Sequence, residues 1–443
     1  MKRVLIITYY WPPSGGSGVQ RWVKFTKYLP QNGWQPIIYT PENPELTTLD
    51  KTLAAEIPPD TEIIRRHITE PYGIYRKLMG KGSSTDLKVL TAAGSGKDEV
   101  NPINGGRKSW KQRLSLFIRG NFFIPDPRVM WLRPSVRFLK KYLREHPVDV
   151  IVTTGPPQSM HLIGLKVSRA TGIPWVADFR DPWTKMFYFK HLGLTRCSER
   201  KHHRQEQAVL DGATRVIAVS PMVQDEFRAM TGTPVELITN GFDEDDFAGT
   251  FERDEYFNIT HTGLFASDGN PLTLWKVLAG KCKSDEEFGK SLRIRLVGKT
   301  DKEIVDSITE AGLGENLRDF GYRSHDVAVK EQRNASVLIL PLRQEPEYRA
   351  VLPGKLFEYL ASRRPILGIG QTDGAMARIV RDTSSGTVCD WDEEEKMRAW
   401  IDEAWDKFVS DSLDDNTSDI SCFTRRNLAA RLAGVLDDIV KEH

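Results

Sequence analysis

The sequence has few cysteines, no long hydrophobic run and almost no net charge. Its four cysteines are scattered and form no CxxC pair or zinc-binding pattern, as is typical of the reduced cysteines of a cytosolic protein. No stretch reaches the ~18 apolar residues of a membrane-spanning helix, so we expect any membrane contact to be peripheral. The net charge of +2 does not indicate a nucleic-acid partner, and we expect none.

Short apolar, β-rich runs alternate with stretches of helical periodicity, which predicts parallel sheets with crossover helices. One series of expected strands is 3–8, 35–40, 148–153, 175–178 and 215–220, and the other is 257–263, 293–298, 337–340 and 365–368. A chain of 443 residues is long enough for two domains. We therefore predict α/β domains at 1–245 and 246–420, and a terminal helix at 421–443 that packs back across the junction.

Residues 80–106 do not fit this scheme, because they are rich in small and polar residues and lack periodicity. We interpret them as a mobile surface insertion. Residues 107–145, which follow, contain eleven basic and two acidic residues interleaved with apolar ones. This pattern suits an anionic membrane surface or a polyanionic partner, and a solvated helix face packed on the core is the alternative. We expect a cytoplasmic protein in peripheral contact with the inner membrane.

A glycine-rich loop follows the first expected strand. Gly15, Gly16 and Gly18 precede a segment of helical periodicity, and such a turn lets backbone N–H groups approach an anionic ligand. A tight turn without a ligand is the alternative. The spacing is not G-x-G-x-x-G, and no acidic residue closes the strand 35–40, so a nicotinamide dinucleotide is disfavoured.

Polar residues follow the third and fourth expected strands. His161 comes shortly after TTGPP, and Asp178 and Arg180 lie within ADFRDPW. Strand ends of open α/β sheets border the ligand crevice. We therefore predict that Asp178 orients sugar hydroxyls or acts as a base with Arg180 as its partner, and we count His161 as a third catalytic candidate. A structural ion-pair network of Asp178, Arg180 and Asp181 is the alternative.

The strongest local signal is LPGKLFEYLASRRP at 352–365. It predicts a helix that starts near Pro353 at the ligand crevice, where the exposed amides and the positive end of the dipole can meet a pyrophosphate. Lys355 adds a positive charge, and Glu358 can accept both hydroxyls of a ribose diol. We count Leu356 with them as a donor-binding candidate. A simple pair between Lys355 and Glu358 is the alternative.

These features together resemble the retaining glycosyltransferases of family four. The resemblance rests on the glycine loop, on NGFD at 240–243, on the turn at Gly263 and on the PGKLFEYLA helix. It covers nearly the whole chain apart from 80–106. It implies the GT-B fold, in which two Rossmann-like domains face each other across a cleft, and transfer from a nucleotide sugar with retention at the anomeric carbon.

The resemblance also implies roles for particular residues. Gly16 would line the acceptor side of the donor pyrophosphate, and Gly263 would approach the phosphates through its backbone. Asp178 would lie near the transferred sugar, and Glu358 would bind the nucleotide ribose. Asn240, in the NGFD segment, is a further donor-binding candidate.

Two departures from the family pattern concern the donor. Ala350 replaces the first glutamate of the E-x7-E signature, which contacts the donor sugar in the family. The turn after Gly263 lacks the arginine that the family often uses on the pyrophosphate. Lys299, Lys355 or Arg349 would supply that charge.

The sequence has no convincing D-x-D motif at a strand end, so we expect no metal ion and no cofactor besides the nucleotide-sugar substrate. Positive charge and helix dipoles can stabilise the leaving diphosphate instead. The expected acceptor is a surface glycan or a lipid-linked glycan. A GT-B nucleotide-sugar epimerase is one alternative. A non-catalytic nucleotide-sugar-binding subunit of a glycan assembly complex is the other, and Ala350 and the missing arginine after Gly263 favour it.

Overall fold

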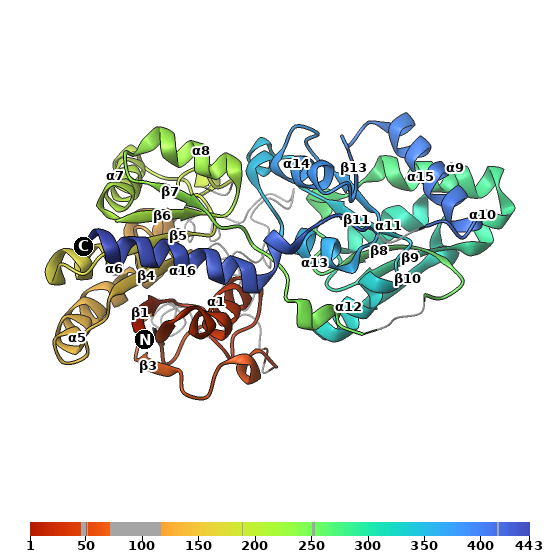
Figure 1. The fold of residues 1–443 in the computed structure, drawn as a ribbon. Coiled ribbons are helices and arrows are strands. Elements are labelled where there is room, and N and C mark those ends of the chain that lie inside the picture. The colour runs from red at the N-terminus through yellow and green to blue at the C-terminus, as the bar shows by residue number, and fades with distance from the viewer. Residues whose placement is uncertain (46–49, 51, 71–116, 188, 250–252, 414–415) are drawn as a thin grey trace. The chain divides into compact units, whose positions relative to one another are not determined.

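The computed structural model describes the chain except residues 46–49, 51, 71–116, 188, 250–252 and 414–415. The described residues form two compact units, Met1–Thr239 with Arg425–His443, and Asn240–Thr424 (Figure 1). The sequence placed the boundary at 245/246, whereas the units divide between Thr239 and Asn240. The proposed insertion at 80–106 lies outside the described residues.

The first unit contains a seven-stranded parallel sheet with the order β3-β2-β1-β4-β5-β6-β7. Its strands are β1 (Lys2–Ile7), β2 (Trp34–Pro41), β3 (Glu62–Arg66), β4 (Val150–Gly155), β5 (Trp175–Phe179), β6 (Arg215–Ala218) and β7 (Val235–Leu237). The inner strands are almost continuously buried, because helices cover both faces of a parallel sheet. The strand order reverses between β1 and β4, so their carboxyl ends border the switch point where such sheets bind ligands.

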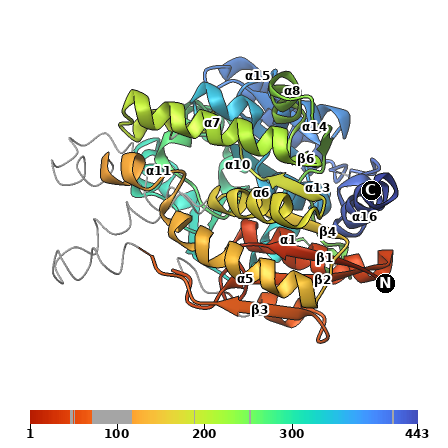
Figure 2. The same ribbon diagram turned by 90° about the vertical axis from the view of Figure 1, so that its left-hand side faces the viewer.

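Two groups of helices lie in the described part of the first unit. Helix α1 (Ser17–Tyr28) packs against the terminal helix α16 (Arg425–Glu442), while α5 (Leu132–Glu145), α6 (Ser159–Thr171), α7 (Arg196–Gly212) and α8 (Pro221–Met230) pack in a row, of which Figure 2 shows α5 to α7 clearly. Leu428, Leu432 and Ile439 bury one face of α16 at helical spacing. The end of the chain therefore completes the unit that the N-terminus begins.

The second unit contains a six-stranded parallel sheet with the order β10-β9-β8-β11-β12-β13. Its strands are β8 (Phe257–Thr262), β9 (Leu292–Val297), β10 (Leu317–Gly321), β11 (Val337–Pro341), β12 (Ile366–Ile369) and β13 (Gly386–Cys389). Its helices are α9 (Leu272–Ser284), α10 (Glu286–Ser291), α11 (Lys302–Glu310), α12 (His325–Asn334), α13 (Gly354–Ser362), α14 (Ala375–Asp382) and α15 (Glu394–Val409). Helix α9 packs with α10, α11 and α15, and α12 packs on β8 and α13. Both units thus have the Rossmann-like layering that the sequence predicted.

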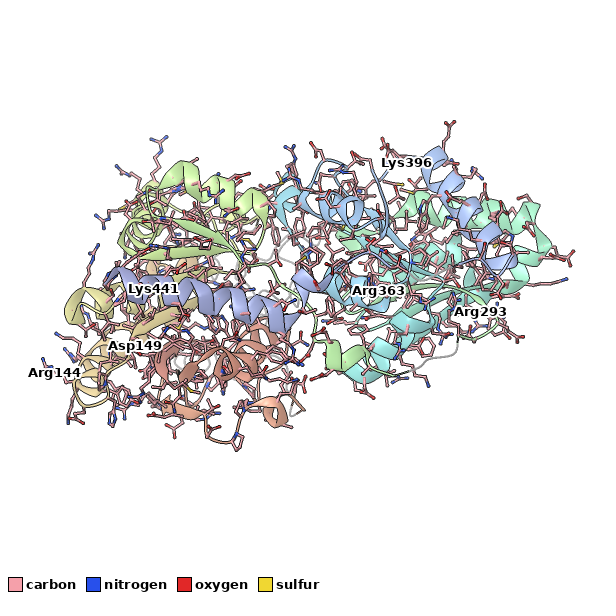
Figure 3. All side chains as sticks on the ribbon, in the orientation of Figure 1. Arg144, Asp149, Arg293, Arg363, Lys396 and Lys441 are labelled. Atoms are coloured by element: carbon pink, nitrogen blue, oxygen red, sulfur yellow. The ribbon has the colours of Figure 1, made fainter. Side chains whose placement is uncertain are left out.

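Charged side chains cover the outer surfaces of both units. Arg144 of α5 projects away from the ribbon (Figure 3), whereas the exposed Lys396 of α15 reaches back to the Val388 carbonyl at 2.8 Å. In the described part of the chain, no helix is both long and apolar enough to cross a lipid bilayer.

Candidate functional site

Two glycine turns meet at the carboxyl edge of the second unit's sheet. Gly263 follows β8 with a φ of 89°, and Gly298 follows β9 with a φ of 143°. A Cβ atom on Gly298 would lie 2.1 Å from the carbonyl oxygen of Gly263. The Gly263 amide donates to the Val297 carbonyl at 2.7 Å, which holds the turns together. The backbone angle disfavours a side chain at both positions, and at Gly298 the neighbouring backbone also leaves no space for one.

Lys355 lies directly against the Gly263 turn, since a Cβ atom on Gly263 would lie 2.6 Å from Lys355 Cε. Lys355 Nζ donates to the Leu264 carbonyl at 2.6 Å and lies 3.2 Å from His261 Nε2. Burial, together with the charge of Lys355, holds the pKa of His261 well below its usual value. The imidazole is therefore neutral and can accept a hydrogen bond from the ammonium group. His261 helps to hold the amino group of Lys355 at the turn.

Helix α13 carries Lys355 in its first turn and Glu358 one turn later. The N-cap is Pro353, and no side chain caps this helix end. Glu358 is half-buried, and its Oε2 accepts a hydrogen bond from Gln332 Nε2 at 3.0 Å. Glu358 therefore has a partner on α12, so a simple pair with Lys355 does not account for its contacts. Leu356 is fully buried, and its amide donates to the Pro353 carbonyl at 3.1 Å, so its part is to pack α13 on the core.

The other donor-binding candidates are more dispersed. The exposed Lys299 follows Gly298, and its carbonyl accepts from the Phe265 amide at 2.9 Å, which places it beside the Gly263 turn. Asn240 is the half-buried first residue of the second unit, and Gly16 belongs to the first unit. The structure thus brings Gly263, Lys299, Lys355 and Glu358 to one sheet edge.

This cluster has the chemistry that a nucleoside diphosphate requires. An ammonium group, tight glycine turns and a helix N-terminus together favour a bound anion. A carboxylate one helical turn away can accept hydrogen bonds from a vicinal diol such as that of ribose. The cluster uses residues of the second unit alone.

In the first unit, Asp178 is fully buried and its ion-pair partner is Arg21, not Arg180 as the sequence suggested. Arg21 Nη2 donates to Oδ1 at 2.8 Å and Arg21 Nε to Oδ2 at 3.2 Å. Trp22 Nε1 and Thr154 Oγ1 also donate to Oδ2, each at 2.9 Å. Burial by itself would raise the pKa of Asp178, but Arg21 and these donors outweigh it and lower the pKa. Four donors leave this carboxylate little capacity to act as a base.

Arg180 lies instead over the start of α1. Its Nε donates to Thr154 Oγ1 at 3.1 Å, and its Nη2 donates to the Pro156 carbonyl. A Cβ atom on Gly18 would lie 2.0 Å from Arg180 Nη1, so glycine is needed there to admit the guanidinium group. Gly16 is the N-cap of α1 with a φ of 110°. The glycine loop therefore presents a helix N-terminus and an arginine side by side.

His161 is fully buried beneath Gly155. Its Nδ1 lies 2.8 Å from Thr153 Oγ1, and the same hydroxyl oxygen accepts from Trp175 Nε1 at 2.8 Å. Burial lowers the pKa of His161 to about 3, so the ring is neutral at pH 7. A Cβ atom on Gly155 would lie 2.4 Å from Nε2. Its predicted part in catalysis, like that of Arg180, stays a prediction.

Four residues of these sites belong to no motif in the sequence: Arg21, His261, Gly298 and Gln332. Gly298 carried a usable signal, because a glycine that ends a buried strand often marks a close approach of two backbones. The other three lie within segments of helical or strand periodicity. They differ from neighbouring polar residues only in the tertiary contacts that their side chains make.

Comparison with known proteins finds one matching family. Residues 85–246 match the model of the family described as Glycosyltransferase Family 4. Among curated protein sequences, none matches the chain significantly.

Several solved structures share the fold over nearly the full chain. The Anabaena HepE protein, solved with UDP and glucose, has a TM-score of 0.58 at 15% identity, with 99% of this chain and 100% of that one covered. WaaG, a glycosyltransferase involved in lipopolysaccharide biosynthesis, has a TM-score of 0.52 at 14% identity, with 98% and 95% covered. A protein described as a UDP-N-acetylglucosamine 2-epimerase from Listeria monocytogenes has a TM-score of 0.53 at 10% identity, with 100% and 98% covered. At such identities the similarity establishes the fold and not the substrate.

Proposed function

We propose that this chain, which has the GT-B fold and matches the Glycosyltransferase Family 4 model at residues 85–246, is a glycosyltransferase that moves a sugar from a nucleotide-sugar donor to a surface-glycan or lipid-linked acceptor. The transfer retains the anomeric configuration and requires no metal ion. The observation that carries the proposal is the joining of Gly263, Gly298, Lys355 and Glu358 at one sheet edge.

The cluster explains how the donor would be activated. When the sugar–phosphate bond breaks, negative charge develops on the departing diphosphate. The Lys355 ammonium group and the N-terminus of α13 are fixed in place before the reaction, so they stabilise that charge without reorganisation. Glu358 orients the nucleoside through its ribose, which holds the bond to be broken in one position.

The first unit is the part of the chain that binds the acceptor in this proposal. Arg180, with a guanidinium nitrogen against the first turn of α1, is the candidate for contact with substrate. Asp178 acts through Arg21, which also donates to the Thr239 carbonyl at 2.7 Å and the Ile238 carbonyl at 2.9 Å. Asp178 thereby holds α1 against β5 and against the segment at Ile238 and Thr239. Its role is to position the glycine loop.

A panel of UDP- and GDP-sugars tests the donor assignment through protection from thermal unfolding and donor turnover. We expect one donor to stabilise the protein and Glu358→Gln to weaken that donor on the order of 10–100-fold, because a charged hydrogen-bond acceptor is lost. Proton NMR of the product should show the donor's anomeric configuration, and activity should survive EDTA. Glu393→Gln, on the surface of the same unit, is the charge-matched control. Failure of every nucleotide sugar to stabilise the protein would exclude the proposal.

The same panel separates the alternatives. The epimerase reading is kept because the Listeria protein shares the fold, and an epimerase would convert the donor sugar without any acceptor. A non-catalytic subunit would be stabilised by the donor and would turn over none of it. Turnover that depends on an added glycan or lipid-linked acceptor supports transfer.

The contact with an anionic membrane rests on the segment that begins at Phe117 and continues through α5. Phe122 is 71% exposed, and Arg133, Arg137 and Arg144 of α5 are exposed. Not all of its basic residues face solvent, because Arg119 and Arg128 are buried. Residues 107–116 lie outside the described part.

We expect Phe122→Ser to reduce cosedimentation with phosphatidylglycerol vesicles several-fold, because an exposed aromatic side chain inserts at the lipid interface. Binding to pure phosphatidylcholine vesicles should be weak for both proteins, since the basic residues of α5 would lack anionic partners. Tyr322→Ser removes a comparably exposed aromatic side chain, at 70%, from the other unit and serves as the control. Unchanged binding of Phe122→Ser would remove this segment from the proposal.

A further inference from the structure

Gln332 of α12 bridges two functional elements from a fully buried position. Its side-chain Nε2 donates to Glu358 Oε2 at 3.0 Å and to Thr262 Oγ1 at 3.0 Å, so both amide hydrogens are used. Thr262 is the last residue of β8, and its amide donates to the Tyr359 hydroxyl at 2.9 Å. The carboxylate of Glu358 is thereby tied to the strand end from which the Gly263 turn departs.

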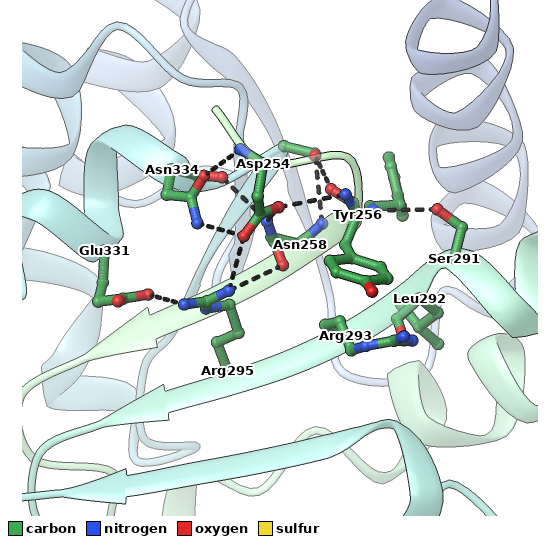
Figure 4. Close-up of polar contacts among 11 residues, drawn as sticks. Asp254, Tyr256, Asn258, Ser291, Leu292, Arg293, Arg295, Glu331 and Asn334 are labelled. Atoms are coloured by element: carbon green, nitrogen blue, oxygen red, sulfur yellow. Dashed lines mark hydrogen bonds and ion pairs between the residues drawn. The ribbon is translucent and has the colours of Figure 1, made fainter. Parts of the chain in front are cut away.

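The helix that carries Gln332 is clamped by polar contacts next to it (Figure 4). Asn334 Nδ2 donates to Asp254 Oδ2 at 2.7 Å, and Asn334 Oδ1 accepts from the Asp254 amide at 3.0 Å. Glu331 pairs with Arg295 at 2.6 Å, and Arg295 also donates to Asp254 at 3.0 Å. Strand β9 and the start of the second unit therefore fix α12, and Gln332 has a rigid base.

We propose that Gln332 is a positioning residue for the nucleotide site: it holds Oε2 of Glu358 so that Oε1 is directed to the ribose diol. This inference rests on the proposed function of the site. A carboxylate on an isolated helix turn samples several rotamers, and each lost rotamer costs binding energy when the ligand arrives. A donor fixed from a second helix removes that cost before binding.

The neutral amide is the feature that makes this arrangement specific. Glutamate at position 332 would have nearly the same shape but would place an acceptor where Glu358 needs a donor. Two carboxylates in contact cannot both be ionised, so the pair keeps one shared proton. The pKa of one of the two groups is therefore raised. At low pH the shared proton joins the two carboxylates and takes the place of the amide hydrogen bond. At high pH this proton is lost, and the two negative charges repel each other.

The test is to titrate UDP and GDP into the wild type, Gln332→Glu, Gln332→Met and Lys330→Gln from pH 5.5 to 8.5. Lys330→Gln makes the same charge change on the exposed side of α12. For the nucleotide that binds, Gln332→Met should lose on the order of tenfold in affinity at all pH values. Gln332→Glu should approach the wild type at pH 5.5 and weaken progressively as the pH rises.

The titratable groups on the elements packed against α12 are present in all four proteins, so the wild-type and Lys330→Gln profiles are the baseline, and the coupling of Glu358 to a second carboxylate is what Gln332→Glu adds. These groups are Lys355, Glu358 and Tyr359 of α13, His261 of β8, and Glu244, Asp245 and Asp246 of the short helix Glu244–Phe247, with His325, Asp326, Glu331 and Arg333 on α12 itself. Thermal unfolding of each variant checks the fold, and Gln332→Met keeps the test valid if Gln332→Glu does not fold.

The outcomes separate the two proposals. Wild-type affinity in Gln332→Met, or a pH profile of Gln332→Glu that matches Lys330→Gln, would overturn the positioning role and leave the nucleotide site intact. Binding of neither UDP nor GDP by the wild type, together with failure of every nucleotide sugar to stabilise it, would overturn the proposed function and this role with it.

Discussion

Replacement of Arg21 by methionine is expected to destabilise the first unit by about 3–5 kcal/mol, because it leaves the charge of Asp178 buried without a counter-ion. Both side chains are fully buried, and the guanidinium group makes two of the four hydrogen bonds that Asp178 accepts. Chemical denaturation followed by tryptophan fluorescence measures the loss. Lys27→Met, on the same helix and 25% exposed at its side chain, is the control and should change stability by less than about 1 kcal/mol.

The double variant Arg21→Met with Asp178→Asn distinguishes a buried charge from lost packing. Because asparagine carries no charge, the double variant should be more stable than Arg21→Met alone. If Arg21→Met and the double variant are equally unstable, the loss of stability comes from the packing of the Arg21 side chain and not from the buried charge. A loss below about 1 kcal/mol in Arg21→Met would show that Asp178 takes up a proton at little cost, and its use as a base would return as a possibility.

The inner strands of both sheets could be predicted from the sequence, while the outermost ones could not. β1, β2, β4, β5 and β6 were expected within a few residues, whereas β3 and β7 at the sheet edges were missed. The same holds in the second sheet, where β10 and β13 form the edges. Inner strands are buried on both faces and appear as apolar runs, but β3 (EIIRR) and β10 (LRDFG) keep exposed residues and carry no such signal.

The candidate site was predictable to the extent that it is local. Lys355 and Glu358 lie on one helix, so their spacing and the helix start could be recognised directly. The partners of site residues were not, because Arg21 meets Asp178 across 157 positions and Gln332 meets Glu358 across 26. Periodicity indicates which side of an element is buried, but it does not indicate which polar group of another element lies against that side.

Gly263→Ala is expected to weaken nucleotide binding on the order of 10–100-fold, because the new methyl group would occupy the position now held by Lys355 and displace a charged donor. A Cβ atom there would lie 2.6 Å from Lys355 Cε. Gly312→Ala is a closely matched control, since both glycines have a φ of 89° and Gly312 has nothing within 4 Å of an added Cβ atom. Isothermal titration with the bound nucleoside diphosphate measures the affinities.

Because the backbone angle is the same, both variants should lose a similar ~1–2 kcal/mol of stability from the left-handed conformation. Any further difference between them in nucleotide affinity reports the displaced lysine. Lys355→Met in the Gly263→Ala background then completes a double-mutant cycle, in which the second replacement should add little because the ammonium group has already left the turn. Full additivity of the two losses would mean that the Gly263 turn and Lys355 contact the nucleotide independently, and that the close packing of one on the other does not set the site.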